Sequence, residues 1–285
     1  MTLRIPVAFG LFAALFSLGA AAEPKKADRP NVIFVLCDDL GPGDVGALWQ
    51  NGRKGKQKFS TPNMDQFAKE GMILSRHYCP APSCMASRSS LMTGRHQGHC
   101  ARRNTQFDAE IPDVHTLGSV MSKAGYATAA IGKWGMAGGP HQLSIKPVRG
   151  DRSPKTNPSH PTLRGFDYFY GYTAHRDAHY HYPKLGNRPL YDGFVDVTDR
   201  LAKCYSTDLL TARAKKWITD HHKAHPKKPF FTYLCYTAPH SGLRIPTTSH
   251  LTAKGNYPPG GGLNGGVQWL EDAANGQINT AKGAV

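Results

Sequence analysis

Three short apolar runs, each followed by polar residues, constrain the fold of this chain more than any other feature. The runs are NVIFVLC at 31–37, ATAAI at 127–131 and FFTYLCY at 230–236. Such runs are typical of strands buried on both faces of a parallel sheet. Asp38 and Asp39 follow the first run, Lys133 the second and His240 the third. Because ligands of open α/β sheets bind at the carboxyl edge of the strands, we expect a site where these residues meet.

Helical patterns alternate with the apolar runs. Thr61 and Pro62 are a typical N-cap and first helical residue, and Gly71 can close the helix that they open. Further helices are expected over 116–123 and 205–222. Strands that alternate with helices predict an α/β fold with a mostly parallel, mixed central sheet flanked by helices.

The first 22 residues are typical of a secretory signal peptide. Arg4 is the only charged residue before Glu23, an apolar run covers 5–18, and three alanines at 20–22 offer a cleavage site. The alternative is an uncleaved membrane anchor, although the run is shorter than the roughly 20 residues that a spanning helix needs. We expect a secreted or periplasmic protein with no transmembrane segment after cleavage.

The remainder divides into two predicted parts. Residues 23–254 carry the strand and helix patterns of one domain. Residues 255–285 form a Gly-rich tail that begins YPPGGGLNGG and has no strand pattern. We therefore assign the chemistry to 23–254.

The charge balance favours an anionic partner. The chain has 35 Lys and Arg against 20 Asp and Glu, a formal net charge of +15. Nucleic acid, an acidic lipid surface, or a phosphate or sulfate substrate would each suit this charge. The basic residues are scattered and form no Lys/Arg-rich tract, and an exported protein rarely meets DNA, so we expect no nucleic-acid partner.

Cys84 lies at the start of a helix-like stretch with Arg88 one turn later. The amide groups and dipole of a helix N-terminus attract anions, and an electropositive N-terminus activates a thiol placed there. A lone Cys is more often buried structure than nucleophile. Asp38 and Asp39 are likewise ambiguous, because adjacent carboxylates bind hard divalent cations but also form turns.

These residues resemble a known family. Cys84-Met85-Ala86-Ser87-Arg88, followed by Thr-Gly-Arg at 93–95, resembles the type I sulfatase signature C-x-P-S-R-x-x-x-x-T-G-R. Other segments resemble further motifs of that family in the same order: PNV…DDLG at 30–41, TPNMD at 61–65, GY…GKW at 125–134, GFD…GY at 165–172 and PFF…APH at 229–240. The resemblance runs from about Pro30 to Pro246.

The resemblance implies an alkaline-phosphatase-like fold and hydrolysis of sulfate esters. A separate maturation enzyme would oxidise Cys84 to formylglycine, and one hydroxyl of the hydrated aldehyde would attack sulfur. Calcium, in preference to magnesium, would be held by Asp38, Asp39 and the modified Cys84. Arg88 would hold the modified residue, while Lys133 and His240 match sulfate-binding or leaving-group positions.

The chain departs from the family pattern at three places. Ala86 replaces the usual Pro of the signature, and Gly135 stands where the family commonly has His in K-W-H. His179, in the stretch AHYHYP at 178–183, resembles a His of sulfatases that have K-W-G; it is either a replacement or an ordinary loop residue. The family's downstream Asp-Asn pair and Lys have no counterpart before Val285, so we expect the N-terminal portion of a sulfatase, cut short.

Three functions remain open from the residues. The first is a sulfuric ester hydrolase acting on an aryl sulfate or a sulfated carbohydrate. The second is a related metal-dependent hydrolase of phosphate monoesters or diesters. The third is a non-catalytic fragment that binds sulfated polyanions through its positive charge.

Overall fold

The structure is a computed structural model that describes residues 29–240 except 59, 105–108, 139–156, 180, 185–187 and 202–203. The chain divides into two units, Met1–Pro30 and Asn31–Val285, and every element below belongs to the second. The predicted signal peptide at 1–22 and the Gly-rich tail at 255–285 lie outside the described residues.

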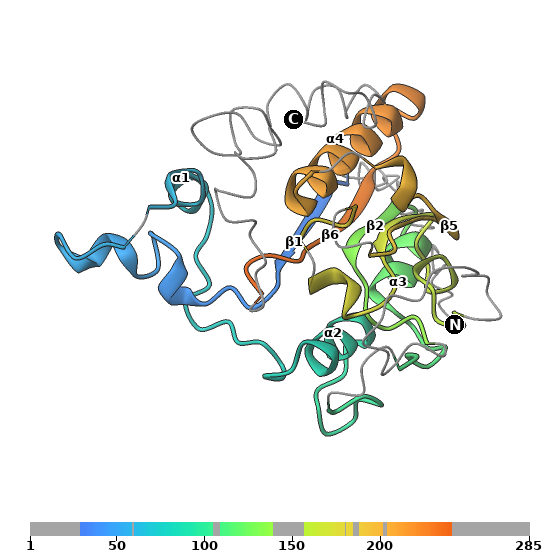
Figure 1. Cartoon of the computed structure of the whole chain (residues 1–285), viewed down its shortest axis with the longest axis horizontal. Helices are drawn as coiled ribbons and strands as arrows, with labels where there is room; N and C mark the ends of the chain where they lie inside the picture. The colour runs from blue at the N-terminus through green and yellow to red at the C-terminus, as the bar shows by residue number, and fades with distance from the viewer. Residues whose placement is uncertain are drawn as a thin grey trace, which may run out of the picture. The chain divides into compact units, whose positions relative to one another are not determined.

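The described part of the chain is built on a mixed six-stranded sheet (Figure 1). Its strands are β1 (Val32–Cys37), β2 (Ala127–Lys133), β3 (Tyr168–Tyr172), β4 (Tyr191–Asp192), β5 (Val195–Asp196) and β6 (Phe230–Tyr236). Their spatial order is β1-β6-β2-β3-β4-β5. The first four strands in that order are parallel, and β4 and β5 add antiparallel pairs at the far edge. The predicted mostly parallel, mixed sheet is confirmed.

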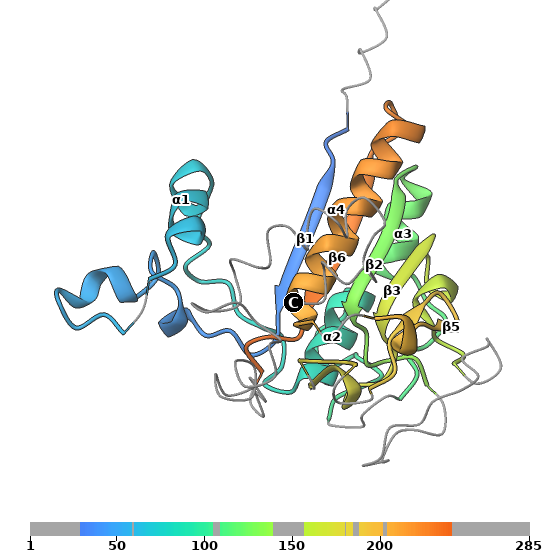
Figure 2. The ribbon, with the colours of Figure 1, turned by 45° about the horizontal axis from the view of Figure 1, so that its top comes forward.

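Helices pack on both faces of this sheet. The α-helices of the described chain are α1 (Pro62–Glu70), α2 (Cys84–Thr93), α3 (Leu117–Lys123) and α4 (Ser206–Ala224), and α1 contributes no residue to either core cluster. Ala129 and Ile131 of β2 pack in one core with Leu209 of α4, whereas Ala130 packs in a second core with Met85 of α2. Successive residues of a strand point to opposite faces, so α4 lies over one face and α2 over the other (Figure 2).

β1 departs from the expected burial. The run 31–37 is predicted to be buried on both faces, yet Ile33 and Val35 are 52% and 51% exposed. β1 is the edge strand of the sheet, and α4 packs over β6, β2 and β3. Only the alternate face of β1, with Phe34, packs against a core cluster.

The expected helix after Thr61 forms as α1, but its apolar side chains are not buried. Met64 and Phe67 are both exposed. Thr61 occupies the N-cap without capping the helix by its side chain. Its Oγ1 instead accepts a hydrogen bond from the amide of Gly46 at 2.8 Å and donates to Asp65 at 3.0 Å.

Two strands also differ from expectation. β2 extends two residues further than 127–131, so Lys133 is its last residue and does not lie beyond it. β3 was not predicted at all, although Tyr168–Tyr172 is an aromatic run of the kind that favours strands. The other two expected helices form as α3 and α4, and Thr116 caps α3 by accepting a hydrogen bond from the amide of Ser119 at 3.1 Å.

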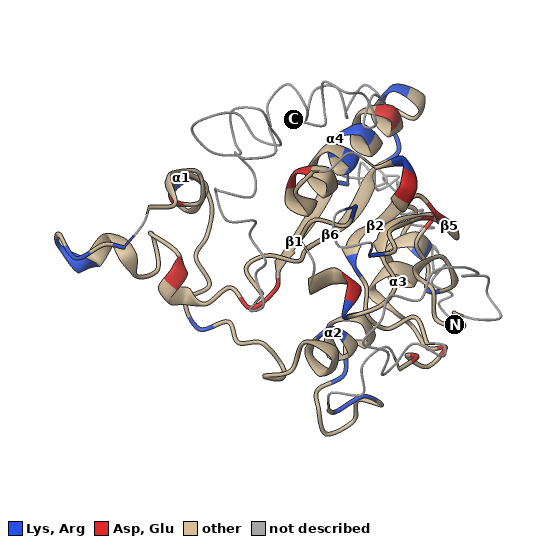
Figure 3. Cartoon of the chain, viewed as in Figure 1, with Lys and Arg blue, Asp and Glu red and all other residues tan. Residues whose placement is uncertain are grey.

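Charged residues are spread over many elements of the described chain (Figure 3). Both signs occur along α4, which agrees with the scattered basic residues of the sequence. Within the ranges that the structure describes, no helix combines the length and the apolar character needed to cross a bilayer.

Candidate active site

The carboxyl edge of the sheet brings together residues that lie far apart in the sequence. β1, β6 and β2 are neighbours and parallel, so Asp38, His240 and Lys133 all lie at one edge. The Nζ atom of Lys133 lies 2.5 Å from Oδ2 of Asp38. The amide of Asp38 donates to the carbonyl of Ala238 at 3.2 Å, which ties the end of β1 to the segment after β6.

Helix α2 places Cys84 and Arg88 of the signature at the same edge. Cys84 is the first residue of this helix, and Arg88 follows one turn later. Nη2 of Arg88 lies 3.3 Å from Oδ1 of Asp38, and Nη1 donates to the carbonyl of Lys133 at 3.0 Å. Arg88 therefore joins the helix to both strands, and it is 3% exposed.

Asp38, Arg88 and Lys133 form a buried charged network. Burial alone would raise the pKa of Asp38, but the positive charges of Lys133 and Arg88 outweigh it and hold that pKa below its ordinary value. Burial and the neighbouring Arg88 lower the pKa of Lys133, although Asp38 partly opposes them. With one carboxylate against two cations, the network has an excess of positive charge that suits an anion.

The Cys84 side chain faces this network. Burial raises the pKa of its thiol, even though Lys133 and Arg88 act in the opposite direction. Its Sγ atom lies 3.2 Å from Nε2 of His175. The unmodified residue is therefore a protonated, partly buried thiol at neutral pH and a weak nucleophile as it stands.

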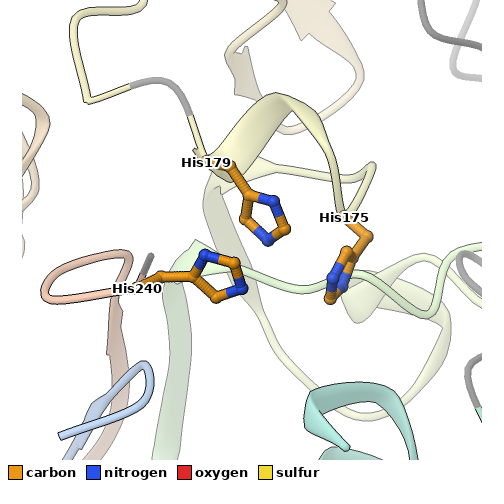
Figure 4. Close-up of side chains that lie close together, drawn as sticks. All are labelled: His175, His179 and His240. Atoms are coloured by element: carbon orange, nitrogen blue, oxygen red, sulfur yellow. The ribbon is translucent and has the colours of Figure 1, made fainter. Parts of the chain in front are cut away.

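Three histidines, His175, His179 and His240, lie close together (Figure 4), and the first of them contacts Cys84. The rings of His179 and His240 stack with centroids 3.7 Å apart, and the ring of His175 lies edge-on to His179 at 4.6 Å. His179 also lies in contact with Lys133, with 2.9 Å between its Nε2 and Nζ of the lysine. Of these histidines, His175 was not predicted as a site residue.

The sequence contains an indirect indication that His175 belongs to the site. His175 follows the end of β3 by three residues, so it lies at the same carboxyl edge as Lys133. Recognition of the aromatic run 168–172 as a strand would have placed the next polar residues at that edge.

The histidine cluster has the spacing of a metal site but the surroundings of an anion site. One ring nitrogen from each of His175, His179 and His240 can lie within 4.8 Å of the others. Burial, followed by the charge of Lys133, lowers the pKa of His179 to about 3, so this ring is neutral. Two stacked rings beside a lysine are poorly arranged to ligate a cation, and we interpret the cluster as a polar wall for an anionic group.

Calcium fits the two aspartates by the chemistry of their donors. Asp38 and Asp39 offer hard carboxylate oxygens, the ligands that Ca²⁺ prefers. Both oxygens of Asp38 already contact Lys133 and Arg88, and Oδ2 of Asp39 lies 3.5 Å from Nε2 of His240. The sulfur of Cys84 is too soft for calcium, whereas an oxygen at that position would fit. Two carboxylates supply at most four of the six to eight oxygens of a calcium site, so further ligands must come from outside this set.

Comparison with known proteins decides the family. A family model described as Sulfatase matches residues 30–264. The chain belongs to the sulfatase family. It is 37% identical over 161 residues to human arylsulfatase D, which covers 52% of this chain, and 33% identical over 235 residues to mouse arylsulfatase J, which covers 79%. The crystal structure of Ps i-CgsB in complex with k-i-k-neocarrahexaose matches 87% of the chain with a TM-score of 0.56 and 26% identity.

The fold is that of the alkaline-phosphatase-like sulfatases. The chain spans only part of the length of the sulfatases named above. It covers 24% of arylsulfatase D and 35% of arylsulfatase J, and 54% of the solved i-CgsB chain.

Proposed function

We propose that the site around Cys84 hydrolyses sulfate esters. The observation that carries the proposal is the placement of Cys84 at the first turn of α2, beside the buried cations Arg88 and Lys133. Membership of the sulfatase family supports this chemistry. The excess positive charge of the network is the complement of a sulfate group.

The nucleophile proposed is formylglycine made from Cys84 by a separate maturation enzyme. The thiol itself is protonated at neutral pH and is a weak nucleophile. Replacement of sulfur by oxygen at this position would also supply a hard ligand to a cation held by Asp38 and Asp39. Calcium bound there would withdraw electrons from that oxygen and from the sulfate.

The side chains of this chain take complementary roles around the ester. Arg88 would hold residue 84 near Asp38, because its guanidinium contacts Asp38 just after β1 and the carbonyl of Lys133 in β2. Lys133 would offset the negative charge of the sulfate oxygens, and His240 would donate a proton to the leaving oxygen. His179 orients Lys133 through their 2.9 Å contact.

The proposed substrate class includes aryl sulfates and sulfated carbohydrates. The similarity to arylsulfatases D and J supports the first. The solved i-CgsB complex with k-i-k-neocarrahexaose supports testing the second. The predicted signal peptide at 1–22 would direct the protein out of the cytoplasm. Its substrates would then be sulfate esters found outside the cytoplasm.

Peptide mass spectrometry tests the proposed nucleophile. The protein is produced with and without a formylglycine-generating enzyme, and the peptide that contains Cys84 is analysed in each sample. We expect the aldehyde in the first sample and the thiol in the second, with sulfate-ester turnover confined to the first. Turnover by protein whose Cys84 is entirely unmodified would contradict the proposal.

A further inference from the structure

Gly135 leaves a space in the site that another residue fills. It follows Lys133 by two residues, at the position where sulfatases commonly have His. A Cβ atom added to Gly135 would lie 3.3 Å from Nδ1 of His175. The ring of His175 therefore lies against the space that a side chain at position 135 would enter.

The pairing of β2 with β3 explains why a residue that follows β3 lies beside Gly135. β2 and β3 are parallel neighbours, and their pairing continues past the strand ends. The amide of Trp134 donates to the carbonyl of Tyr172 at 3.0 Å, and that of Gly135 donates to the carbonyl of Thr173 at 3.2 Å. A residue just beyond Thr173 is thereby held beside Gly135, in reach of the same edge.

His175 contacts the reacting position directly. Its Nε2 lies 3.2 Å from Sγ of Cys84, and the residue is 1% exposed. Nδ1 of the same ring lies 3.8 Å from that sulfur, so the edge of the ring that carries both nitrogens faces residue 84. An imidazole nitrogen within hydrogen-bonding distance of a reacting atom has the geometry of a general base.

The two other histidines of the cluster are engaged differently. Nε2 of His179 lies 2.9 Å from the ammonium of Lys133, which occupies its lone pair. Nε2 of His240 lies 3.5 Å from the carboxylate of Asp39. The contacts given above turn His179 to Lys133 and His240 to Asp39, whereas the ring of His175 contacts residue 84.

We infer that His175 is a catalytic residue, the proton acceptor for the group on residue 84, in place of the His that the family commonly has at position 135. The inference rests on the proposed sulfatase function. The proton leaves the hydroxyl oxygen borne by residue 84 and binds Nε2 of His175: the O–H bond breaks, the N–H bond forms, and the bonding electron pair stays on oxygen. Loss of the proton to water after turnover restores the neutral imidazole.

The first test uses the thiol form and needs no activity. The chain is produced without maturation enzyme, and alkylation of Cys84 by iodoacetamide is followed by peptide mass spectrometry at one fixed pH. His175→Gln keeps the volume of the side chain but cannot take up the proton. We expect alkylation to slow roughly tenfold, the equivalent of one hydrogen bond. The control is His222→Gln, at an exposed position of α4, and its rate should stay close to that of the wild type. Equal rates for the wild type and His175→Gln would overturn the inferred contact.

The second test uses the aldehyde form and 4-nitrophenyl sulfate. We expect His175→Gln to lower kcat about 100-fold, the usual contribution of a positioned base, with KM changed little. Gly135→His in the His175→Ala background should recover part of kcat, since His tolerates the left-handed backbone found at Gly135, whose φ is 69°. Gly135→Ala in the same background should recover none.

The outcomes separate the two proposals. Unchanged kcat in His175→Gln together with a large loss in His179→Gln would overturn the role of His175. Absence of turnover by wild-type protein that carries the aldehyde would contradict the proposed function, and the alkylation rates would still decide whether His175 acts on residue 84. Recovery of kcat by Gly135→His would also show that the loss in His175→Ala is not a folding defect.

Discussion

Asp38 is the residue on which the site depends. Its two carboxylate oxygens contact cations from different elements, Arg88 of α2 and Lys133 of β2. All three side chains are almost fully buried. A buried ion pair contributes modestly to stability as a whole, but removal of one partner strands the other charge without compensation. The network therefore fixes the geometry of the site and penalises any substitution that unbalances it.

Replacement of Arg88 tests this network. We expect Arg88→Ala to lower the free energy of unfolding by about 3 kcal/mol or more, because Asp38 and the carbonyl of Lys133 lose a buried donor. Urea denaturation measures the change. Arg95→Ala is the matched control, since Arg95 belongs to the same signature but is exposed, and its effect should stay within about 0.5 kcal/mol. Equal effects of the two substitutions would show that the network does not form.

His160 makes stability depend on pH at a second site. Its Nε2 donates to the carbonyl of Gly193 at 3.2 Å, and its ring stacks on Phe194. Burial lowers the pKa of His160 to about 4, against 6.5 for an ordinary His. The unfolded chain therefore binds a proton more readily, and stability is lost as the pH falls from about 6.5 to about 4, by up to about 3 kcal/mol.

The His160→Gln variant isolates that contribution. Other histidines also titrate, so the quantity to measure is the difference in unfolding free energy between wild type and variant at a series of pH values. We expect the advantage of the wild type to shrink as the pH falls through this window. A difference that does not vary with pH would exclude a buried neutral His160.

At the scale of the elements, the parallel strands β1, β6 and β2 made part of the site predictable from the sequence. Asp38, Lys133 and His240 follow or end apolar runs that sequence patterns identify well, so their convergence at one edge was foreseeable. His175 was missed because β3 was not recognised, and a polar residue after an unrecognised strand has no assigned place. The contact of Arg88 with Asp38 was also out of reach, since it depends on how α2 packs on the sheet.

Burial was the least predictable property of the elements. The helical spacing of apolar residues in α1 predicts one buried face, and the continuous apolar run of β1 predicts two. Phe67 and Ile33 are nonetheless exposed. A local pattern shows which residues share a face, but not whether another element covers that face. Coverage is decided by the packing of distant segments.

Substitution of Gly132 tests the register between β2 and β6. Its φ is 111°, and a Cβ atom there would collide with the carbonyl of Cys235 on the neighbouring strand. We expect Gly132→Ala to destabilise the fold by about 4 kcal/mol or more, because the backbone of a central strand must move. Thermal or urea unfolding measures the effect.

Gly193→Ala provides the comparison for that substitution. Gly193 also has positive φ, at 59°, but nothing lies within 4 Å of its added Cβ. Only the backbone strain of about 1–2 kcal/mol is then expected. If Gly132→Ala were as mild as Gly193→Ala, the pairing of Gly132 with Cys235 would be wrong.

For the whole molecule, binding and folding are linked. The chain covers 35% of arylsulfatase J and 54% of the solved i-CgsB chain, and it nonetheless brings Cys84, two cations and two aspartates to one edge. A ligand that binds only the folded chain stabilises the whole fold, so a cation at the aspartates should be detectable as a change in global stability.

Calcium provides that measurement. We expect Ca²⁺ at 100 times its dissociation constant to raise the free energy of unfolding by about 2.7 kcal/mol and chelation to reverse the gain. Asp39→Ala should abolish the response, because a carboxylate ligand is lost. Asp44→Ala removes a nearby exposed carboxylate that bonds the amide of Gly41, and it should leave the calcium response intact. Identical thermal midpoints with calcium and with chelator would contradict a site at Asp38 and Asp39.

Residue 84 is proposed to carry out sulfate-ester hydrolysis, and release of inorganic sulfate measures that reaction itself. Protein whose Cys84 has been converted to the aldehyde is compared with the Cys84→Ala variant on 4-nitrophenyl sulfate and on 4-nitrophenyl phosphate. We expect sulfate release by the converted protein, none by the variant, and slower hydrolysis of the phosphate ester. Equal sulfate release by the two proteins, or faster hydrolysis of the phosphate ester by the converted one, would contradict it.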